Sequence, residues 1–297
     1  MAELLQLVIT GITVGMVYAL IALGFVLVWK SSGVANLALG QLVLISSWFS
    51  YAMLDPQEAN LPVWLGLPLV VLFALVMGWV IERIILRPLI AQPILSLITV
   101  TLGVAFFLEG LVTFVWPKSE APMPHLFPQE SISIGTASVS YESLWTVIIA
   151  LILFGLLSLY FKYHRMGIAM RATADDQLAV QACGVPVTRI FSGSWMLACV
   201  LAAIGGFLIS SIGGGINPGL METGLRAFSV VILGGLDSFL GAIVAGPLIG
   251  LAENIGGYYL TPLTWQGVKY VIPFIIIIIV MFVRPYGLFG EKRIERI

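Results

Sequence analysis

Residues 4–29 read LLQLVITGITVGMVYALIALGFVLVW, an apolar run that contains no charged residue. A helix needs about 20 apolar residues to cross the hydrocarbon core of a bilayer. Gly11 and Gly15 form a small-xxx-small pair within the run, and Gly24 extends the same small-residue face. Such faces let two helix backbones approach closely inside a membrane. The run therefore predicts a membrane span that packs tightly against another helix.

The composition extends this reading to the whole chain. Of its 297 residues, 60% are hydrophobic and only 10% are charged, whereas about a quarter of a soluble domain is charged. Long apolar runs recur along the chain, with no sign of the alternating segments of about ten residues that make a β-barrel. We predict an all-α fold, a polytopic integral membrane helical bundle with eight to nine transmembrane helices. We treat residues 1–297 as a single transmembrane domain.

The expected spans follow from the apolar runs. They are 4–29, 35–54, 62–86, 94–116, 142–162, 190–212, 226–236, 238–260 and 266–283. Residues 226–236 are too few to cross about 30 Å at a rise of about 1.5 Å per residue. We therefore expect one short or broken helix at this position.

The basic residues are distributed unequally between the two sides of these spans. Cytoplasmic loops of membrane proteins carry an excess of Lys and Arg. One side keeps only Lys118, Arg226 and Lys269 of the 14 basic residues. The other side has Lys30, Arg83, Arg87, Lys162, Arg165, Arg171, Arg189, Arg284, Lys292, Arg293 and Arg296. This asymmetry places residues 163–189 and the C-terminus in the cytoplasm, and the loop 117–141 and the N-terminus outside.

A polar segment interrupts the apolar chain in this cytoplasmic stretch. From residue 169 it reads AMRATADDQLAVQAC, which is rich in helix formers. Thr173 precedes the acids Asp175 and Asp176, as in a capping box at a helix N-terminus. Gly184 and Pro186 supply a stop signal. The pattern predicts a helix of about three turns, with Leu178, Ala179, Ala182 and Cys183 along one side.

This cytoplasmic helix has two interpretations, a solvated connector or a docking element for a cytoplasmic partner. A simple connector between two spans is usually shorter and has no need of a capped helix with an apolar side, so we favour docking. The residues assigned to it are Arg171, Asp175, Asp176, Ala179, Ala182, Gly184 and Pro186.

Several functions are disfavoured by what the sequence lacks. It has no GxxxxGK[ST] motif, so any ATP that drives this protein must be bound by another polypeptide. It has no HExxH or GxSxG motif, and we expect no enzyme activity. Cys183 and Cys199 lack metal-ligand spacing, so we expect neither a metal nor a cofactor. A net charge of −1 gives no basic surface for nucleic acid.

Three stretches carry a resemblance to a known family. GITVGMVYALIALGFVLVWKSSGVANLALGQLVLIS, residues 11–46, resembles the opening of branched-chain amino acid ABC transporter permeases of the LivH type. RATADDQLAVQACGVPVTRI, residues 171–190, resembles their cytoplasmic coupling loop. GGGINPGLMETGLRAFSVVILGGLDSFLGAIVAGPLIGLAENI, residues 213–255, is similar to their C-terminal third. The resemblance covers nearly the whole chain in order.

The resemblance implies a function, a location and a set of partners. The chain would be a permease domain with a coupling loop at 163–189, in a binding-protein-dependent ABC importer. Its location would be the bacterial inner (plasma) membrane, as a multi-pass protein surrounded by membrane lipid. Its partners would be a second, LivM-type permease, two cytoplasmic ABC ATPase subunits and a periplasmic solute-binding protein.

One departure from the family pattern leaves the solute open. The family commonly shows NFAHG[EQ] where this chain reads NLALGQ from Asn36 to Gln41, so Leu39 replaces the usual histidine. Branched-chain amino acids or related small amphipathic solutes are one expectation. Urea, short amides and aromatic acids, which relatives of the same architecture carry, are the alternative. The replacement predicts a more apolar path.

Helix breaks and intramembrane polar residues indicate where a solute could pass. Glycine-rich breaks are expected near Ser31–Gln41 and Gly213–Asp237, and broken helices often surround transport sites; tight packing alone is the other explanation. Glu109, in the middle of a span, is either a structural hydrogen-bonding group or a path residue, and would serve an ion-coupled secondary transporter. The residues assigned to the path are Asn36, Gln41, Glu109, Asn217, Gly234, Gly235 and Asp237.

The predicted topology is tested by labelling single cysteines with a membrane-impermeant reagent, in a background where Cys183 and Cys199 are replaced. Because of the charge asymmetry, we expect positions 119–140 to react from outside intact cells, and position 292 to react only after lysis. Labelling of position 292 from the outside would show that the orientation is inverted.

Overall fold

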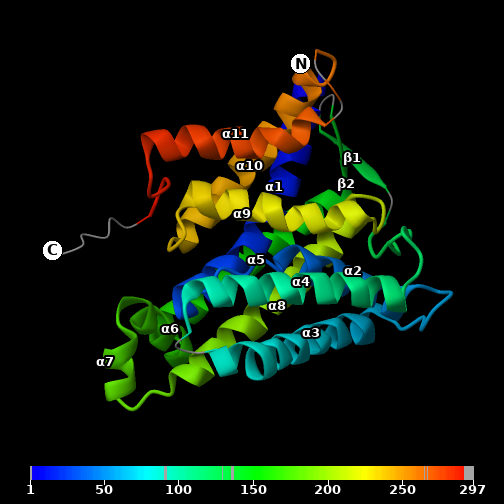
Figure 1. Ribbon diagram of the computed structural model, residues 1–297. Coiled ribbons are helices and arrows are strands. Elements are labelled where there is room, and N and C mark those ends of the chain that lie inside the picture. Colours follow the sequence, from blue (N-terminus) through cyan, green and yellow to red (C-terminus); the bar gives the residue numbers. More distant parts are fainter. Residues whose placement is uncertain are drawn as a thin grey trace.

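The computed structural model describes residues 2–89, 92–128, 130–134, 137–263, 265 and 267–290. Within these residues the chain is a helical bundle with one small β-hairpin (Figure 1). The helices of the bundle are α1 (Ala2–Ser32), α2 (Leu39–Leu54), α3 (Val63–Val80), α4 (Ile94–Val115), α5 (Tyr141–Tyr163), α8 (Val187–Ile212), α9 (Glu222–Gly234), α10 (Phe239–Leu260) and α11 (Val268–Val283). This confirms the predicted all-α membrane bundle.

The remaining elements lie outside the long helices. Two short helices follow α5, namely α6 (Arg165–Asp175) and α7 (Gln177–Ala182). The strands β1 (Ser131–Ile134) and β2 (Ala137–Ser140) pair antiparallel, with Ser131 opposite Ser140. A π-helical segment (Ile81–Leu86) continues α3 and is followed by a 3₁₀ turn (Arg87–Leu89), and a second 3₁₀ turn (Pro218–Met221) precedes α9.

The helix lengths agree with the predicted spans. Six helical segments of the described residues are long and apolar enough to cross a membrane, and α2 and α11 are shorter apolar helices. The predicted short helix at 226–236 is α9, which has 13 residues. Eight apolar helices and one short helix thus account for the expected eight to nine.

The second predicted span begins later than expected. The sequence predicts a start at residue 35, but α2 begins at Leu39 because residues 33–38 are unwound. Gly33 has a positive φ of 68°, and the side-chain Oδ1 of Asn36 accepts a hydrogen bond from the amide of Ala38 at 3.1 Å. Asn36 is nevertheless buried. A non-helical backbone segment therefore enters the interior of the bundle, where protein rather than lipid surrounds it.

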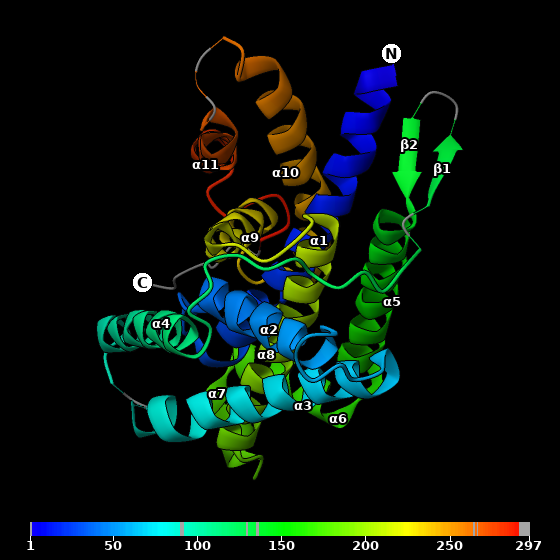
Figure 2. The same cartoon turned by 90° about the vertical axis from the view of Figure 1, so that its right-hand side faces the viewer.

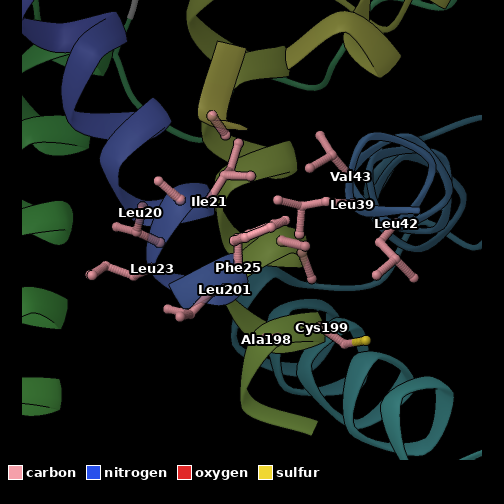
Figure 3. Close-up of a cluster of buried hydrophobic side chains, with 14 of the residues drawn as sticks. Leu20, Ile21, Leu23, Phe25, Leu39, Leu42, Val43, Ala198, Cys199 and Leu201 are labelled. Atoms are coloured by element: carbon pink, nitrogen blue, oxygen red, sulfur yellow. The ribbon is translucent and has the colours of Figure 1, made fainter. Parts of the chain in front are cut away.

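Helix α1 is the centre of the bundle. Its side chains from Val17 to Leu23 are almost completely buried, and it packs against α10, α8, α9 and α5. In Figure 2 it lies between α10 and α5. Figure 3 shows where its middle turns meet α2 and α8, with Phe25 between Leu39 and Leu201. Helix α1 is apolar on every side, and this fits its position, since other helices surround it.

The predicted small-residue face of α1 packs against α10. A Cβ atom added at Gly15 would lie 2.5 Å from the carbonyl oxygen of Gly246, and one added at Gly250 would lie 2.3 Å from that of Gly11. Gly24 does not extend this face as predicted: it lies nine residues after Gly15, on the other side of the helix, and packs against the backbone of Ala198 in α8. Because lipid is itself apolar, the hydrophobic effect does not drive helices together inside a membrane. Close packing of this kind stabilises the α1–α10 pair through dispersion.

The bundle has two distinct ends. The hairpin β1–β2 and the loop between α2 and α3 lie at one end, on the right in Figure 1, and α6 and α7 lie at the other. We call these the outer and the inner end. The described residues that follow α11 reach the inner end, while residues 291–297, which include the predicted cytoplasmic Lys292, Arg293 and Arg296, lie outside the described residues.

The segment that follows α11 closes the C-terminal end of α9. The amide of Leu288 donates to the carbonyl of Leu233 at 2.9 Å, and the amide of Phe289 donates to that of Gly234 at 3.0 Å. Gly235 ends α9 with a φ of 107°, and an added Cβ there would lie 2.6 Å from the amide nitrogen of Gly290. Carbonyl groups that the end of a helix leaves unpaired are thus satisfied by a segment some 50 residues further along the chain.

The contact between α1 and α10 predicts a difference between two glycine-to-alanine substitutions. Gly15→Ala should destabilise the protein by about 1–3 kcal/mol, because the new methyl group meets backbone atoms that must move apart. The matched Gly155→Ala in α5 has no atom within 4 Å of the new Cβ and should be neutral or slightly stabilising, since alanine favours a helix. Thermal unfolding of the purified protein measures both, and equal melting temperatures for the two variants would contradict the close contact.

Candidate functional site

A cavity of about 600 Å³ lies in the outer half of the bundle. It is enclosed by parts of α1, α8, α9, α10 and α11 and by the glycine-rich turn after α8. Its polar lining residues are Thr10, Thr13, Ser143, Asn217, Glu222, Thr223, Arg226, Asn254 and Lys269. Its larger apolar lining residues are Val14, Ile209, Ile212, Leu220 and Tyr270. The cavity thus offers both signs of charge beside an apolar wall, and its size is that of a small-molecule site.

Arg226 is the most highly connected charge in this cavity. Its Nη1 donates to the hydroxyl of Tyr18 at 3.2 Å, and its Nη2 lies 3.2 Å from a carboxylate oxygen of Glu222. Its Nε lies 3.5 Å from Oε1 of Glu253, and its guanidinium group lies 4.8 Å from the ring centroid of Tyr270. A guanidinium group fixed in this way by α1, α9, α10 and α11 keeps one orientation.

Glu253 supports Arg226 from below the cavity surface. Only 4% of the residue is exposed, and its Oε2 has no hydrogen-bond partner among the described residues. Its neighbour Asn254 faces the cavity and donates to Thr10 Oγ1 at 2.8 Å. The buried acid balances the arginine, while the amide joins α10 to α1.

The two predicted helix breaks meet beneath the cavity. A Cβ added at Gly40, in the first turn of α2, would lie 2.1 Å from the carbonyl oxygen of Met221. One added at Gly224, in the first turn of α9, would lie 2.4 Å from the amide nitrogen of Gly40. Leu220 and Thr223, which line the cavity, belong to the same turn region. The backbone contact between α2 and α9 therefore lies next to the cavity.

The residues assigned to a solute path from the sequence fall in three places. Asn217 lines the outer cavity, and Asn36 and Gln41 flank the α2–α9 contact below it. Glu109 lines a separate cavity of about 260 Å³ that also contains Trp48 and Lys118.

The other assigned path residues lie at the inner end of α9. Gly234 and Gly235 contact Gly241 and the turn after α11, and the carbonyl of Asp237 accepts a hydrogen bond from Lys30 at 3.3 Å. The structure thus brings Asn217, Asn36 and Gln41 to one region. The cavity of Glu109 borders the same turn through Pro218 and Met221, whereas Gly234, Gly235 and Asp237 lie at the inner end.

The main charged groups of the cavity were not assigned to the path from the sequence. Glu222 and Lys269 line it, and so does Arg226, which the sequence shows only as a basic residue in the outer half. A signal was present, because Arg226 and Lys269 are two of the three basic residues that depart from the charge asymmetry. Basic residues on the outer side of a membrane protein with a positive-inside pattern are therefore candidates for binding a solute.

The polar segment after α5 differs from its predicted form. Instead of one helix that starts at Thr173, there are two helices, α6 and α7, with a break at Asp176. Thr173 is buried within α6 and donates to the carbonyl of Ala169 at 2.8 Å. Asp176 has the extended backbone of a capping residue and accepts from the amide of Ala179 at 3.0 Å. The capping prediction was therefore wrong by three residues, because an aspartate competes well for the capping position.

Among the side chains of α7 that the structure describes, Val180 is buried and the small ones are exposed. Val180 is buried in a cluster with Met170, Ile190 and Phe191. Ala179, Ala182 and Cys183 are exposed. The helix ends at Ala182, and Gly184 has a φ of 79°, so the predicted stop lies where expected. Residues 179, 182 and 183 share one helix face, which the structure leaves uncovered at the inner end. Arg171 and Asp175 belong to α6 instead.

The fold and the cavity together define a class of protein, a multi-pass membrane permease with a cavity near one end and a helical protrusion at the other. The sequence matches the family model described as branched-chain amino acid transport system / permease component over residues 7–281. The chain belongs to this family of ABC importer permeases.

Individual relatives cover nearly the whole chain. The high-affinity branched-chain amino acid transport system permease protein LivH of Salmonella typhimurium is 30% identical over 99% of this chain and 97% of its own length. The corresponding protein BraD of Pseudomonas aeruginosa is 30% identical over 99% of this chain and 98% of its own length. These relatives are transport permeases rather than enzymes, and their names describe components of larger transport systems.

One solved structure has a similar fold. A chain of PsaBC from Streptococcus pneumoniae in complex with Fab superposes with a TM-score of 0.51 and covers 95% of this chain and 91% of its own length. The two sequences are 16% identical, so the likeness concerns the fold alone.

The Arg226–Glu253 pair predicts a non-additive effect on stability. Arg226→Met alone should destabilise the protein by about 3–5 kcal/mol, because it leaves the buried carboxylate of Glu253 without its partner. The double variant Arg226→Met, Glu253→Leu should recover most of this loss. Glu222→Gln, which removes an exposed partner, should cost less than about 1 kcal/mol.

Thermal unfolding of these three variants, and of Glu253→Leu alone, provides the test. A double variant that is as unstable as the sum of the two single substitutions would show that the two residues do not act as a pair.

Proposed function

We propose that this chain is one of two permease subunits of a binding-protein-dependent ABC importer in a bacterial inner membrane. Its partners are a second, LivM-type permease, two cytoplasmic ATPases and a periplasmic solute-binding protein. The family and the names of the relatives support this assembly, and so does the lack of a phosphate-binding loop in this chain. The family favours it over an ion-coupled secondary transporter.

The solute is a branched-chain amino acid or a closely related amphipathic molecule, and it enters through the outer cavity. The single observation that carries this proposal is the composition of the cavity wall. Lys269 and Arg226 suit a carboxylate, Glu222 suits an ammonium group, and Ile209, Ile212 and Val14 suit an apolar side chain. Urea and short amides have no carboxylate and little apolar surface, so they use this wall less well.

The path continues from the cavity through the contact between α2 and α9. Backbone packing at Gly40 and Gly224 closes it in this state. The unwound residues 33–38 lie directly before α2 in the chain. Segments without helical hydrogen bonds near the middle of a membrane are suited to serve as hinges and ligand sites. Asn36 and Gln41 lie next to this closure and are the polar groups a solute meets when it opens.

Helix α7 transmits the ATPase cycle to the bundle. It presents Ala179, Ala182 and Cys183 as a small, exposed apolar surface, and Val180 fixes it to the inner end of α8. Small side chains permit close approach of a partner, and the buried anchor connects a push on α7 to α8.

Removal of the flexible cation of the cavity tests the solute path. Lys269→Gln should lower leucine uptake by the reconstituted importer about tenfold at saturating loaded binding protein, since a charge-assisted hydrogen bond contributes about 1.5–3 kcal/mol. The control is Lys118→Gln, which removes an exposed lysine that pairs with Glu58 at 4.0 Å on the outer surface. Equal uptake by the two variants would place the path elsewhere.

A charge on the exposed face of α7 tests coupling. Ala182→Arg should abolish both uptake and the stimulation of ATP hydrolysis by loaded binding protein, because the new side chain separates the two surfaces. Gln181→Arg is the matched control, since residue 181 is exposed but lies on the opposite side of α7 from residue 179. Full stimulation in the Ala182→Arg importer would exclude this face as the docking surface.

A further inference from the structure

A second cavity lies at the inner end, away from the proposed solute path. Its volume is about 280 Å³, and it is bounded by the last turns of α1 and α5, the first turn of α10 and one side of α6. Three basic side chains line it, Lys30 from α1, Lys162 from α5 and Arg171 from α6. None of its lining residues is acidic. Three elements that are separate in the chain thus bring positive charge to one cavity.

The three cations remain available to a ligand. Within the described residues, none of them forms an ion pair with Asp or Glu. The ammonium group of Lys30 donates to the carbonyl of Asp237 at 3.3 Å, and that of Lys162 lies 5.1 Å from the ring centroid of Tyr163. A carbonyl and an aromatic ring orient these side chains without neutralising them. Lys162 and Arg171 are exposed, and Lys30 is half-buried.

Apart from Ser31 and Ser158, the rest of the cavity lining is apolar. Its floor is made of Val26, Leu27, Phe161, Met170 and Phe239. The rings of Phe161 and Phe239 lie 5.6 Å apart and join α5 to the start of α10. A ligand that satisfies both parts of this cavity carries a negative group at one end and a hydrocarbon portion at the other.

The surroundings of the cavity are those of a lipid-facing groove. The helices on either side, α5 and α10, expose large apolar side chains such as Leu156, Leu159, Leu240 and Val244. A molecule from the bilayer reaches the cavity along these surfaces without entering water. The charge asymmetry of the sequence puts the same end of the bundle at the cytoplasmic leaflet, where anionic phospholipids meet basic residues.

We propose that this inner cavity is a binding site for an anionic phospholipid. The phosphate lies among Lys30, Lys162 and Arg171, and the start of an acyl chain covers the apolar floor. A lipid bound here contacts α6, α1 and α5 together. Helix α6 leads directly into the proposed coupling helix α7.

The competing explanation for the three basic side chains is that positive charge is generally favoured at the C-terminal ends of helices. Lys30 and Lys162 lie in the last turns of their helices, where cations are favoured in any case. Arg171 is different because it lies in the middle of α6, and the apolar cavity between the three is not required by charge placement. An experiment must therefore compare these three residues with equally basic positions elsewhere at the inner end.

Native mass spectrometry of the assembled importer provides that comparison. The complex is titrated with dioleoylphosphatidylglycerol and, separately, with dioleoylphosphatidylcholine. The variant Lys30→Gln, Lys162→Gln, Arg171→Gln removes the cluster, and Arg83→Gln, Arg87→Gln, Arg189→Gln removes three charges elsewhere on the same end. Ser158→Trp fills the cavity from α5 and leaves every charge in place.

We expect the cluster variant to bind phosphatidylglycerol at least about tenfold more weakly, since each basic residue near an anionic lipid contributes measurably. The tryptophan variant should also bind it more weakly, and the control variant should bind as the native complex does. Excess inorganic phosphate should compete poorly, because it lacks the hydrocarbon portion. Undiminished binding by the cluster variant, equal loss in the control, or equal binding of phosphatidylcholine would each overturn the proposal.

A second measurement separates lipid from protein as the occupant. A cysteine at position 158 is treated with a bifunctional crosslinker in the assembled importer in membranes, with Cys183 and Cys199 replaced. We expect no crosslink to the second permease. A crosslinked permease pair would show that the cavity is covered by a subunit, which would overturn the lipid site.

Discussion

The close backbone contact between α1 and α10 is the constraint on which the rest of this structure depends. Lipid surrounds a membrane protein with material as apolar as its own side chains, so helices associate through dense packing and not through exclusion of water. Gly11 and Gly15 meet Gly246 and Gly250 with no room for a side chain. Because α1 is fixed in this way, its other faces are available to α8, α9 and α5. The groups that line the outer cavity converge around the first half of α1.

The same central helix explains how a buried charge is tolerated. Arg226 comes from the short helix α9, but its partners Tyr18 and Glu253 come from α1 and α10. An isolated charge inside a membrane protein is costly, and it persists where partners or a polar cavity compensate it. The tight α1–α10 seam holds two of these partners in place. The packing of α1 against α10 therefore permits a buried charge beside it.

The sequence was informative about the helices and less so about what happens between them. Hydropathy located the spans to within a few residues because length and apolarity are local properties. It missed the start of α2, since whether residues 33–38 wind into a helix depends on the interior into which Asn36 is drawn. The capping pattern placed a helix start at Thr173, although Asp176 forms the cap. The pairing of Arg226 with Glu253 could not be read from the sequence, because it depends on how α9 crosses α10. Gly234 and Gly235 were assigned to a path because glycines mark breaks, and in the structure both make close backbone contacts, with Gly241 and with the turn after α11.

The attachment of residues 284–290 to α9 has a consequence for the order in which this protein is made. A ribosome synthesises α9 well before Leu288 and Phe289 exist, yet the amides of these two residues satisfy the carbonyls of Leu233 and Gly234. During translation the C-terminal end of α9 therefore lacks its native hydrogen-bond partners, and this end can acquire its final geometry only after α10 and α11 have been inserted. The short helix is among the last parts of the bundle to be completed, and a nascent chain that stops before residue 288 cannot complete it.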